Sequence, residues 1–261
     1  MGFQFKKKYG QNFLTQISIT RRIAQVVEDK DESLVIEIGC GDGRLTTQLC
    51  KLYSMVLGYE IDKDVIPYLY ENLKEVNNCV VISDDFLKRN LDHDLLSYNY
   101  EKLYVFGNLP YYITTPIIEK LINSKLNINK MVFMVQKEVG DRFTAKVGTK
   151  EYGSLTVFLK YYYDIKKEFF VSRKNFEPMP NVDSVVVSFS KRENRIKANN
   201  EQLFFKLVKD SFTHKRKTLK NNLDGYNLEK VAEVLKKHNL DLNVRAEKLP
   251  LEIFIEIANN L

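Results

Sequence analysis

The chain has 261 residues, of which 44% are hydrophobic and 28% are charged, and its formal net charge is +6. This length accommodates one sizeable α/β domain and a small accessory domain. No apolar run approaches the roughly 20 residues that a membrane-spanning helix needs, and the early lysines are not followed by the apolar segment of a secretory signal. We therefore expect a cytoplasmic protein with no membrane partner.

Cysteine and histidine give no sign of a metal site. Cys40, Cys50 and Cys79 are odd in number and lack the paired spacing of metal ligands, so we expect reduced structural thiols. The 3 histidines do not suggest a metal site or a His-based catalytic triad. The expected protein therefore contains no metal.

A glycine-rich turn follows the first predicted strand, Leu34–Ile36. It reads Glu37-Ile-Gly-Cys-Gly-Asp-Gly-Arg44 and leads into a helix predicted over Arg44–Tyr53. Glycines such as Gly39 and Gly41 let the backbone approach a ligand closely, and free helix amides can meet a carboxylate or phosphate. A glycine pattern alone is weak evidence for such a site.

Acidic residues follow the next two predicted strands, Met55–Tyr59 and Cys79–Ile82. Glu60 lies 21 residues after Gly39, close to the offset of about 20 residues for an acid that binds ribose hydroxyls. Asp85 follows the second of these strands, so the two carboxylates suit an adenosine. The loop reads Gly-Cys-Gly-Asp-Gly and lacks the G-x-G-x-x-G of dinucleotide binding. S-adenosylmethionine is therefore favoured, and a nicotinamide cofactor is the alternative.

The fourth predicted strand, Leu103–Phe106, is followed by Asn108-Leu109-Pro110-Tyr111. The carboxyl end of a parallel strand is where open α/β sheets bind ligands. The exocyclic amine of a nucleobase attacks poorly unless two acceptors bind its hydrogens. The Asn108 side-chain oxygen and a backbone carbonyl fixed by Pro110 supply two such acceptors, with Tyr111 stacked on the base. An ordinary turn after a strand is the alternative reading of these four residues.

The remaining elements of this part complete a mostly parallel sheet. Lys130–Val135 is a fifth predicted strand, and a helix begins at Lys137. Beyond about residue 146 the pattern changes to extended segments at Leu155–Tyr163, Phe169–Val171 and Ser184–Ser190. A mostly parallel sheet with an antiparallel edge is typical of the methyltransferase version of the doubly wound α/β fold.

The last quarter of the chain is expected to form a separate helical domain. We place the catalytic domain at residues 1–190 and the helical domain at residues 191–261, with Lys191–Asn200 as a polar linker. Apolar residues then recur at helical spacing in three segments, Glu201–Leu223, Leu228–His238 and Leu251–Ala258.

Positive charge is concentrated in this helical part. From residue 191 onward there are 15 Lys and Arg against 10 Asp and Glu. Lys215, Arg216, Lys217 and Lys220 form the densest cluster, which we place on the first of the three helices. Such a run is usually a solvated helix face. Beside a base-modifying site it is a candidate contact to RNA phosphates.

Motifs along essentially the whole chain resemble the ribosomal RNA adenine dimethyltransferases, and among them the KsgA type. Pro116 and the Arg245-Ala-Glu ending favour this type over relatives that methylate large-subunit RNA. The order and spacing of the blocks carry the resemblance: Tyr9-Gly-Gln-Asn-Phe-Leu14, the glycine loop, Asn108-Leu-Pro-Tyr111, Ile113-Thr-Thr-Pro-Ile-Ile118, Gln136-Lys-Glu-Val139, Tyr152-Gly-Ser-Leu155, Phe176-x-Pro-x-Pro-x-Val-Asp-Ser184 and Arg245-Ala-Glu-x-Leu249.

The resemblance implies a Rossmann-like S-adenosylmethionine-dependent methyltransferase sheet with a small C-terminal helical domain that binds RNA. The implied activity is the dimethylation of two adjacent adenosines in the 3′-terminal hairpin of small-subunit (16S) ribosomal RNA, with a role in small-subunit biogenesis. The implied partners are this RNA and the partly assembled small ribosomal subunit, and the protein is expected to act as a monomer. Whether its owner is a bacterium or an organelle stays open.

The resemblance also assigns roles to single residues. Tyr112 stands where the family usually has Asn, so the pocket for the target base is expected to be tighter or oriented differently. The implied cofactor-binding residues are Asn12, Leu14, Gly39, Gly41, Glu60, Ile61, Asp85, Phe86 and Asn108. The implied residues around the target base are Asn108, Leu109, Pro110, Tyr111 and Phe176, the last as a second aromatic opposite Tyr111.

Two other functions remain as alternatives. A DNA adenine methyltransferase shares the logic of the Asn-Leu-Pro-Tyr motif, but a separate domain for DNA sequence recognition is not visible. A non-catalytic RNA-binding assembly factor on the same fold would be indicated by loss of Glu60, Asp85 or Asn108, and all three are present.

Overall fold

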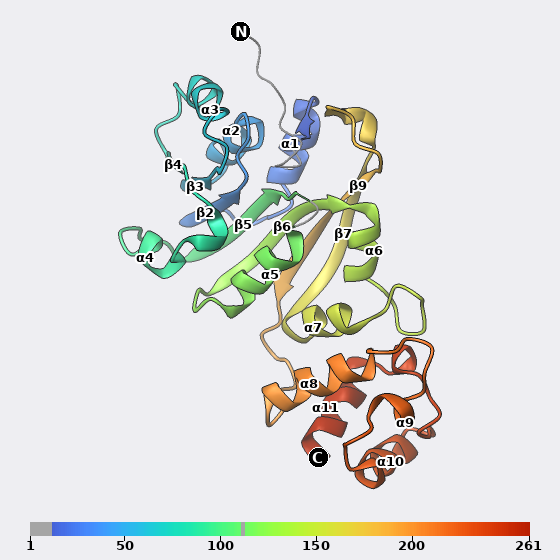
Figure 1. Cartoon of the computed structure of the whole chain (residues 1–261). Helices are drawn as coiled ribbons and strands as arrows, with labels where there is room; N and C mark the ends of the chain where they lie inside the picture. The colour runs from blue at the N-terminus through green and yellow to red at the C-terminus, as the bar shows by residue number, and fades with distance from the viewer. Residues whose placement is uncertain (1–11, 111–112) are drawn as a thin grey trace. The chain divides into compact units, whose positions relative to one another are not determined.

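The computed structural model describes residues 12–110 and 113–261 (Figure 1). The chain divides into two compact units. The first contains the chain up to Gly140 together with Lys166–Lys191, and the second contains Asp141–Ile165 and Arg192–Leu261. The second unit therefore includes residues 141–165, which lie within the range 1–190 that we expected for the catalytic domain.

Seven strands of the described residues form one sheet in the order β4-β3-β2-β5-β6-β9-β7. Neighbours from β4 to β6 are parallel, whereas β9 runs antiparallel to β6. The mostly parallel sheet with an antiparallel strand is confirmed. The strands are β2 (Ser33–Ile38), β3 (Met55–Tyr59), β4 (Cys79–Ile82), β5 (Lys102–Asn108), β6 (Ile128–Gln136), β7 (Tyr163–Val171) and β9 (Ser184–Lys191).

Helices cover both faces of this sheet (Figure 1). All 6 residues of β2 are buried, as expected for a strand covered on both faces. One face packs Val35 and Val56 against Ile23 and Leu49 of the first helices. The helices that begin within the first unit are α1 (Ile17–Ala24), α2 (Arg44–Cys50), α3 (Ile66–Asn72), α4 (Leu91–Leu95), α5 (Thr114–Asn123) and α6 (Lys137–Phe143), with short 3-10 turns η2 (Phe86–Lys88) and η3 (Arg173–Asn175).

A two-stranded sheet lies near the N-terminal end of the described chain. β1 (Phe13–Leu14) pairs antiparallel with β8 (Phe176–Glu177), so that Leu14 lies opposite Phe176. The Thr15 amide extends this pairing by donating to the Asn175 carbonyl at 2.9 Å. Two segments more than 150 residues apart in sequence are thereby fixed to each other.

The second unit has a helical core of its own, in which Phe204, Tyr161 and Phe254 are buried. Asn200 and Asn227 begin two of its helices, because each side chain accepts a hydrogen bond from the backbone amide of the third helical residue, as good N-cap residues do. The helices are α7 (Ser154–Tyr162), α8 (Glu201–Ser211), α9 (Leu219–Asn222), α10 (Leu228–Lys237) and α11 (Leu251–Asn260), with the 3-10 turn η4 (Ala246–Lys248).

The expected extended segment Leu155–Tyr163 is wrong, because Ser154–Tyr162 forms the helix α7. Its residues Thr156, Val157, Leu159 and Tyr161 are buried, and those between them are half-buried. A helix with so few exposed residues gives a nearly continuous apolar run, which the sequence alone does not distinguish from a buried strand. The contacts that decide the matter come from α8 and α11, far along the chain.

The expected helix over Glu201–Leu223 is also wrong, since it divides into α8 and α9 around a turn. The side-chain Nδ2 of Asn222 donates to the backbone carbonyls of Ser211 and His214, at 2.8 and 3.2 Å. Its oxygen accepts from the His214 amide at 3.2 Å. A single side chain therefore satisfies the backbone groups that the interrupted helix leaves open. The helix α2 likewise ends at Cys50, before the predicted Tyr53.

None of the helices in the described part of the chain combines the length and the hydropathy that a membrane span requires.

Candidate functional site

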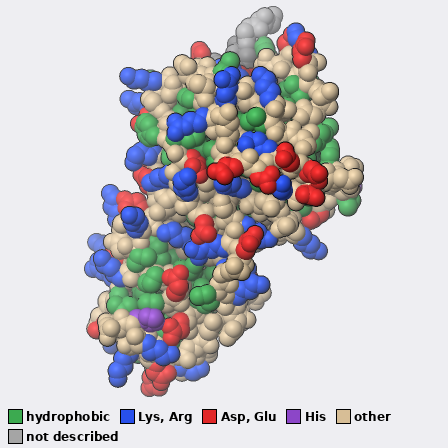
Figure 2. Space-filling view, turned by 180° about the vertical axis from the view of Figure 1, so that it is seen from behind, with side chains coloured by type: hydrophobic (Ala, Val, Ile, Leu, Met, Phe, Trp, Pro, Cys, Tyr) green, Lys and Arg blue, Asp and Glu red, His purple; other side chains and the backbone are tan. Residues whose placement is uncertain are grey.

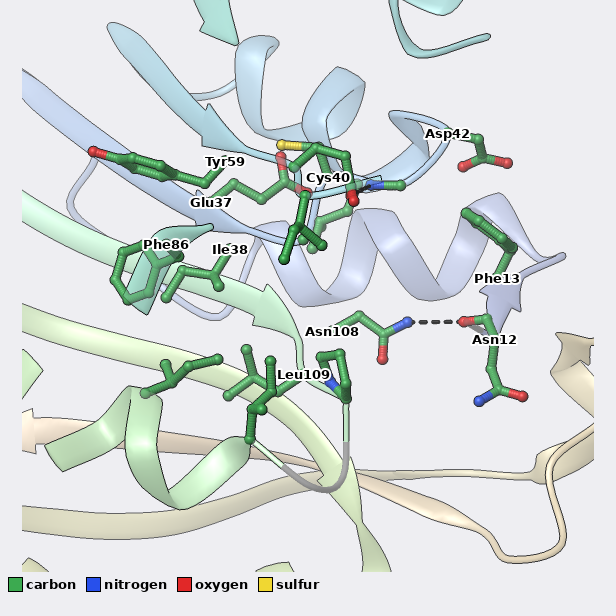
Figure 3. Close-up of a pocket in the computed structure, with 18 of the residues that line it drawn as sticks. Asn12, Phe13, Glu37, Ile38, Cys40, Asp42, Tyr59, Phe86, Asn108 and Leu109 are labelled. Atoms are coloured by element: carbon green, nitrogen blue, oxygen red, sulfur yellow. Dashed lines mark hydrogen bonds between the residues drawn. The ribbon is translucent and has the colours of Figure 1, made fainter. Parts of the chain in front are cut away.

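A cavity of about 260 Å³ lies at the carboxyl ends of the parallel strands (Figure 3). The chain leaves β2 toward β3 and β4 and then returns to β5 on the other side of β2. Such a reversal of strand order opens a crevice that binds ligands in α/β sheets. Residues that line the cavity include Asn12, Phe13, Leu14, Glu37, Ile38, Gly39, Gly41, Asp42, Arg44, Glu60, Ile61, Asp85, Phe86, Asn108, Leu109 and Pro110.

The expected cofactor residues are all in this lining. They come from five separate places in the chain: the N-terminal segment, the ends of β2, β3 and β4, and, for Asn108, the end of β5. Of the residues expected around the target base, Asn108, Leu109 and Pro110 are there as well. Tyr111, and the neighbouring Tyr112, lie outside the described residues.

Hydrogen bonds hold the glycine loop at the end of β3. Gly39 and Gly41 adopt positive φ angles of 77° and 56°, which disfavour residues with a side chain. The Gly39 amide donates to the Tyr59 carbonyl at 2.9 Å, and the Gly41 amide donates to Oε2 of Glu60 at 2.8 Å. These bonds fix the loop against the acid that the sequence analysis assigned to the ribose.

Glu60 is 6% exposed and its carboxylate is oriented by two backbone amides. The Gly41 amide binds one oxygen, and the Asp62 amide binds the other at 2.8 Å. Burial raises the pKa of Glu60, and these two amides oppose the increase because they stabilise the charged form. Each carboxylate oxygen has further lone pairs, so the group can also accept hydrogen bonds from two hydroxyls of a ligand.

The loop after β4 combines two acids with an aromatic ring. Asp85 begins η2 by accepting from the Leu87 amide at 3.0 Å. Phe86 is buried, and its ring meets that of Tyr59 edge to face, with centroids 5.2 Å apart. Lys120 of α5 fixes the loop from outside the cavity through the Leu87 carbonyl, at 3.1 Å. With Ile38 and Leu109, Phe86 gives this end of the cavity an apolar wall (Figure 3).

Asn108 is oriented by the N-terminal segment. Its Nδ2 donates to the Asn12 carbonyl at 3.0 Å (Figure 3). A carbonyl oxygen only accepts hydrogen bonds, so the amide nitrogen must face Asn12 and Oδ1 must face the other way. The side chain is thus left with an acceptor oxygen that is not used by Asn12.

Phe176 is not part of the lining. Its ring is 4% exposed and packs in the same core cluster as Leu14, opposite which it is paired in the two-stranded sheet. In this structure, Phe176 supports the segment that carries Asn12. Its expected role as a wall of the target-base pocket stays a prediction.

Glu37 is a lining residue to which the sequence analysis gave no role. Unlike the other acids, it lies within a strand. Glu37 is the second-last residue of β2, two residues before Gly39, and is 1% exposed. Neither carboxyl oxygen has a hydrogen-bond partner among the described residues. Burial raises the pKa of Glu37 well above its usual range, and the nearby Thr46 hydroxyl offsets this only in part. The acid immediately before the glycines was the available signal.

Phe13 and Arg44 were missed for a different reason. A Cβ atom on Gly41 would lie 2.7 Å from Cε1 of Phe13, so the ring rests directly on the glycine loop. Arg44 reaches back to the Leu14 carbonyl at 2.7 Å. Both contacts join segments about 30 residues apart in sequence, and no local pattern predicts them.

The basic run of the second unit is exposed, but three of its four residues lie outside a helix, so its expected place on the first predicted helix is wrong. Lys215, Arg216 and Lys217 lie in the turn between α8 and α9, and Lys220 lies on α9. Each of these side chains is exposed, which leaves them accessible to a polyanion. On the face shown in Figure 2, Lys and Arg are spread widely over the surface, with Asp and Glu between them.

No group of three or more His, Cys, Asp or Glu side chains in the described residues is arranged to bind a metal ion. Cys40, Cys50 and Cys79 are free thiols.

Comparison with known proteins identifies the family. The family model described as ribosomal RNA adenine dimethylase matches residues 2–261. The chain belongs to this family. Curated relatives named ribosomal RNA small subunit methyltransferase A are 42% identical in Streptococcus pneumoniae, over 100% of this chain and 93% of the relative, and 42% identical in Bacillus mycoides, over 100% and 92%.

Solved structures agree with this assignment. A dimethyladenosine transferase from Plasmodium falciparum is 27% identical, with a TM-score of 0.79 over 94% of this chain and 95% of the other. The 23S rRNA methyltransferase ErmE, at 24% identity and a TM-score of 0.78, shares the fold over 95% and 99%. This dimethylase is therefore a ribosomal RNA methyltransferase with a Rossmann-like sheet.

The buried carboxyl of Glu37 predicts that the free energy of unfolding of this protein depends on pH. Its raised pKa means that the folded protein retains a proton that the unfolded chain loses above the usual carboxyl range, so stability falls as pH rises toward the folded-state pKa. The loss has a limiting slope of about 1.4 kcal/mol per pH unit. Glu37→Gln removes this term. Denaturation of the cofactor-free protein should show that the variant gains on the wild type from pH 5 to pH 8.

Glu71→Gln, at an exposed position of α3 away from the cavity lining, is the matched control for the removal of one carboxylate. A constant difference for Glu37→Gln would contradict the assignment of a raised pKa.

Proposed function

We propose that this dimethylase transfers methyl groups from S-adenosylmethionine to the N6 amines of two adjacent adenosines in the hairpin near the 3′ end of small-subunit (16S) ribosomal RNA. The observation that carries the proposal is the hydrogen bond from Asn108 to the Asn12 carbonyl. It leaves an acceptor oxygen at the rim of a cavity that also contains Glu60 and Asp85.

The lining fits S-adenosylmethionine part by part. The two fixed oxygens of Glu60 match the two neighbouring hydroxyls of a ribose. Ile38 and Phe86 provide an apolar wall for the adenine, and Asp85 lies beside them for its amine. The methionine end then lies along the glycine loop, where its ammonium group would give the unpartnered Glu37 carboxyl a counter-ion.

The target adenine is bound on the Asn108 side of the cavity. Asn108 Oδ1 and the backbone carbonyl of Leu109 accept the two amine hydrogens, which directs the nitrogen lone pair out of the ring system. The bound cofactor supplies an activated methyl group. Tyr111 stacks on the base in this proposal, and Phe176 would reach it as the opposite wall only after a change of its buried position.

Proton removal makes a small demand on the protein. Methyl transfer would form the nitrogen–carbon bond as the bond between that carbon and the sulfonium sulfur breaks, leaving a neutral thioether. The amine would then carry positive charge and be strongly acidic, so its proton can pass to water. The rate therefore depends mainly on how well Asn108 and the glycine loop position the two reacting groups. Repetition of the same step on each base gives the dimethylated product.

Each target adenosine must leave its stack to reach Asn108. We propose that Lys215, Arg216, Lys217 and Lys220 bind phosphates of the same RNA, because their exposed charges lie in a part of the chain with a net positive charge. The substrate is then a partly assembled small subunit in the cytoplasm. We propose that the protein acts as a monomer, because residues of one chain line the described part of the cavity.

Fewer observations support the two alternative functions than support the proposed one. A non-catalytic assembly factor has no need for Glu60, Asp85 and Asn108 in one cavity. A DNA methyltransferase is disfavoured because the chain belongs to the ribosomal RNA adenine dimethylase family, whose model matches residues 2–261.

Glu60→Ala tests the cofactor site. The variant loses charge-assisted hydrogen bonds to the ribose, so binding of S-adenosylmethionine should weaken by about 1.5 to 3 kcal/mol in calorimetry. Glu71→Ala, on the exposed side of α3, is the control and should bind normally. Unchanged affinity in Glu60→Ala would exclude the ribose-binding role.

Asn108→Ala separates chemistry from binding. The acceptor is needed most in the transition state, so single-turnover methylation should fall by about 100-fold or more while RNA affinity changes little. Asn123→Ala, at the exposed end of α5, is the control. A near wild-type rate in Asn108→Ala would show that the target base is bound elsewhere.

Replacement of Lys215, Arg216 and Lys217 together by Gln tests the basic run. RNA affinity should fall, and its log-log dependence on salt should flatten by about 0.7 to 0.9 for each lost phosphate contact. Cofactor affinity should not change, and partly assembled subunits should lose most of their advantage over naked RNA as substrates. The control replaces three other exposed lysines of the same unit, Lys209, Lys230 and Lys236.

An unchanged salt dependence in the triple variant would mean that the run is only solvated surface. Equal methylation of naked RNA and of particles by the wild type would contradict the particle as substrate.

A further inference from the structure

Arg44 connects two segments of the site that are distant in sequence. It is the first residue of α2, directly after the glycine loop. One guanidinium nitrogen donates to the Leu14 carbonyl at 2.7 Å, and Nε lies 2.8 Å from Oδ2 of Asp42 within the loop. The planar guanidinium suits this double contact, because its donors point in fixed directions.

The segment that Arg44 contacts is the one that orients Asn108. Asn12 accepts the hydrogen bond from Asn108, and Leu14, two residues later, accepts the hydrogen bond from Arg44. Between them, the Phe13 ring rests on Gly41. The segment is also held by the short pairing with β8 at Phe176 and by the core packing of Leu14. Arg44 is thus a side chain of the glycine loop region that binds the Asn12 segment by a hydrogen bond.

The contacts of Arg44 contribute little to global stability. Its side chain is 44% exposed, and ion pairs of such exposure are screened by water and contribute little to folding. Residues of the sheet core such as Val35 and Val56 are fully buried without it. Replacement of Arg44 is therefore expected to release the N-terminal segment and leave the fold intact.

We propose that Arg44 is a positioning residue for methyl transfer: it docks the segment Asn12–Leu14 on the glycine loop and so keeps the Asn108 oxygen aimed at the target amine. This inference rests on the proposed function, since it assigns Asn108 to the target base. It adds a coupling between the loop that binds the cofactor and the side chain that binds the substrate.

Arg44→Gln is the primary test, with Lys51→Gln at the exposed far end of the same helix as the control. Small misplacements of a reacting group can reduce rates by about 100-fold, so kcat of Arg44→Gln should fall at least 10-fold while KM for RNA stays within about twofold. Hydrogen exchange should accelerate at the Thr15 amide, which is bonded to Asn175, and stay unchanged in β2. Arg44→Lys should recover part of kcat.

A double-mutant cycle with Asn108→Ala shows whether Arg44 acts through Asn108. If it does, adding Arg44→Gln to Asn108→Ala should reduce the rate little further, because the positioned group is already absent. Multiplicative losses would mean that Arg44 acts independently of Asn108 and would overturn the proposal. So would a wild-type kcat for Arg44→Gln, or unchanged exchange at Thr15.

The cycle also separates this inference from the proposed function. If Asn108→Ala itself methylates at the wild-type rate, the assignment of the target base is wrong and the Arg44 proposal is overturned with it. If Asn108→Ala is impaired and Arg44→Gln is not, only the positioning role is lost.

Discussion

The strands β2 and β5 pair in parallel at the point where the chain reverses its direction across the sheet, and the rest of the site depends on this register. Ile38 lies opposite Gly107. Gly39, the first residue after β2, and Asn108, the last residue of β5, therefore lie side by side. A Cβ atom on Gly39 would lie 3.9 Å from the Asn108 carbonyl oxygen. The glycine loop and Asn108 are neighbours because the register of two buried parallel strands is strongly specified.

The electrostatic character of the cavity differs from that of the whole chain. The protein carries a formal charge of +6, whereas the cavity is lined by five acids, Glu37, Asp42, Glu60, Asp84 and Asp85, and by one base, Arg44. Burial raises the pKa of the first three of these carboxyls, which is the cost of removing them from water. A ligand with a sulfonium and an ammonium group would offset that cost. The excess of positive charge elsewhere then remains available for RNA.

The N-terminal segment links the two parts of the proposed site. Asn12 orients Asn108, Phe13 covers Gly41, and Leu14 is fixed by Arg44 and by its pairing with Phe176. The same few residues therefore line the proposed cofactor site and determine the direction of the proposed acceptor. In this proposal, cofactor binding and the alignment of Asn108 are linked through the segment Asn12–Leu14. This segment has little secondary structure of its own.

The sequence by itself determined the parallel strands β2 to β6, the glycine loop and the acids after β3 and β4, because parallel strands end at one edge and a local pattern marks each end. It also placed Asn108 at that edge, although the roles of these residues remain proposals. Only the tertiary structure decided that Ser154–Tyr162 is a helix, that the basic run lies in a turn and that Phe176 is buried. It alone showed the bonds from Arg44 to Leu14 and from Asn108 to Asn12. These features depend on partners far away in the chain, and the spacing of residues within a segment carries no information about such partners.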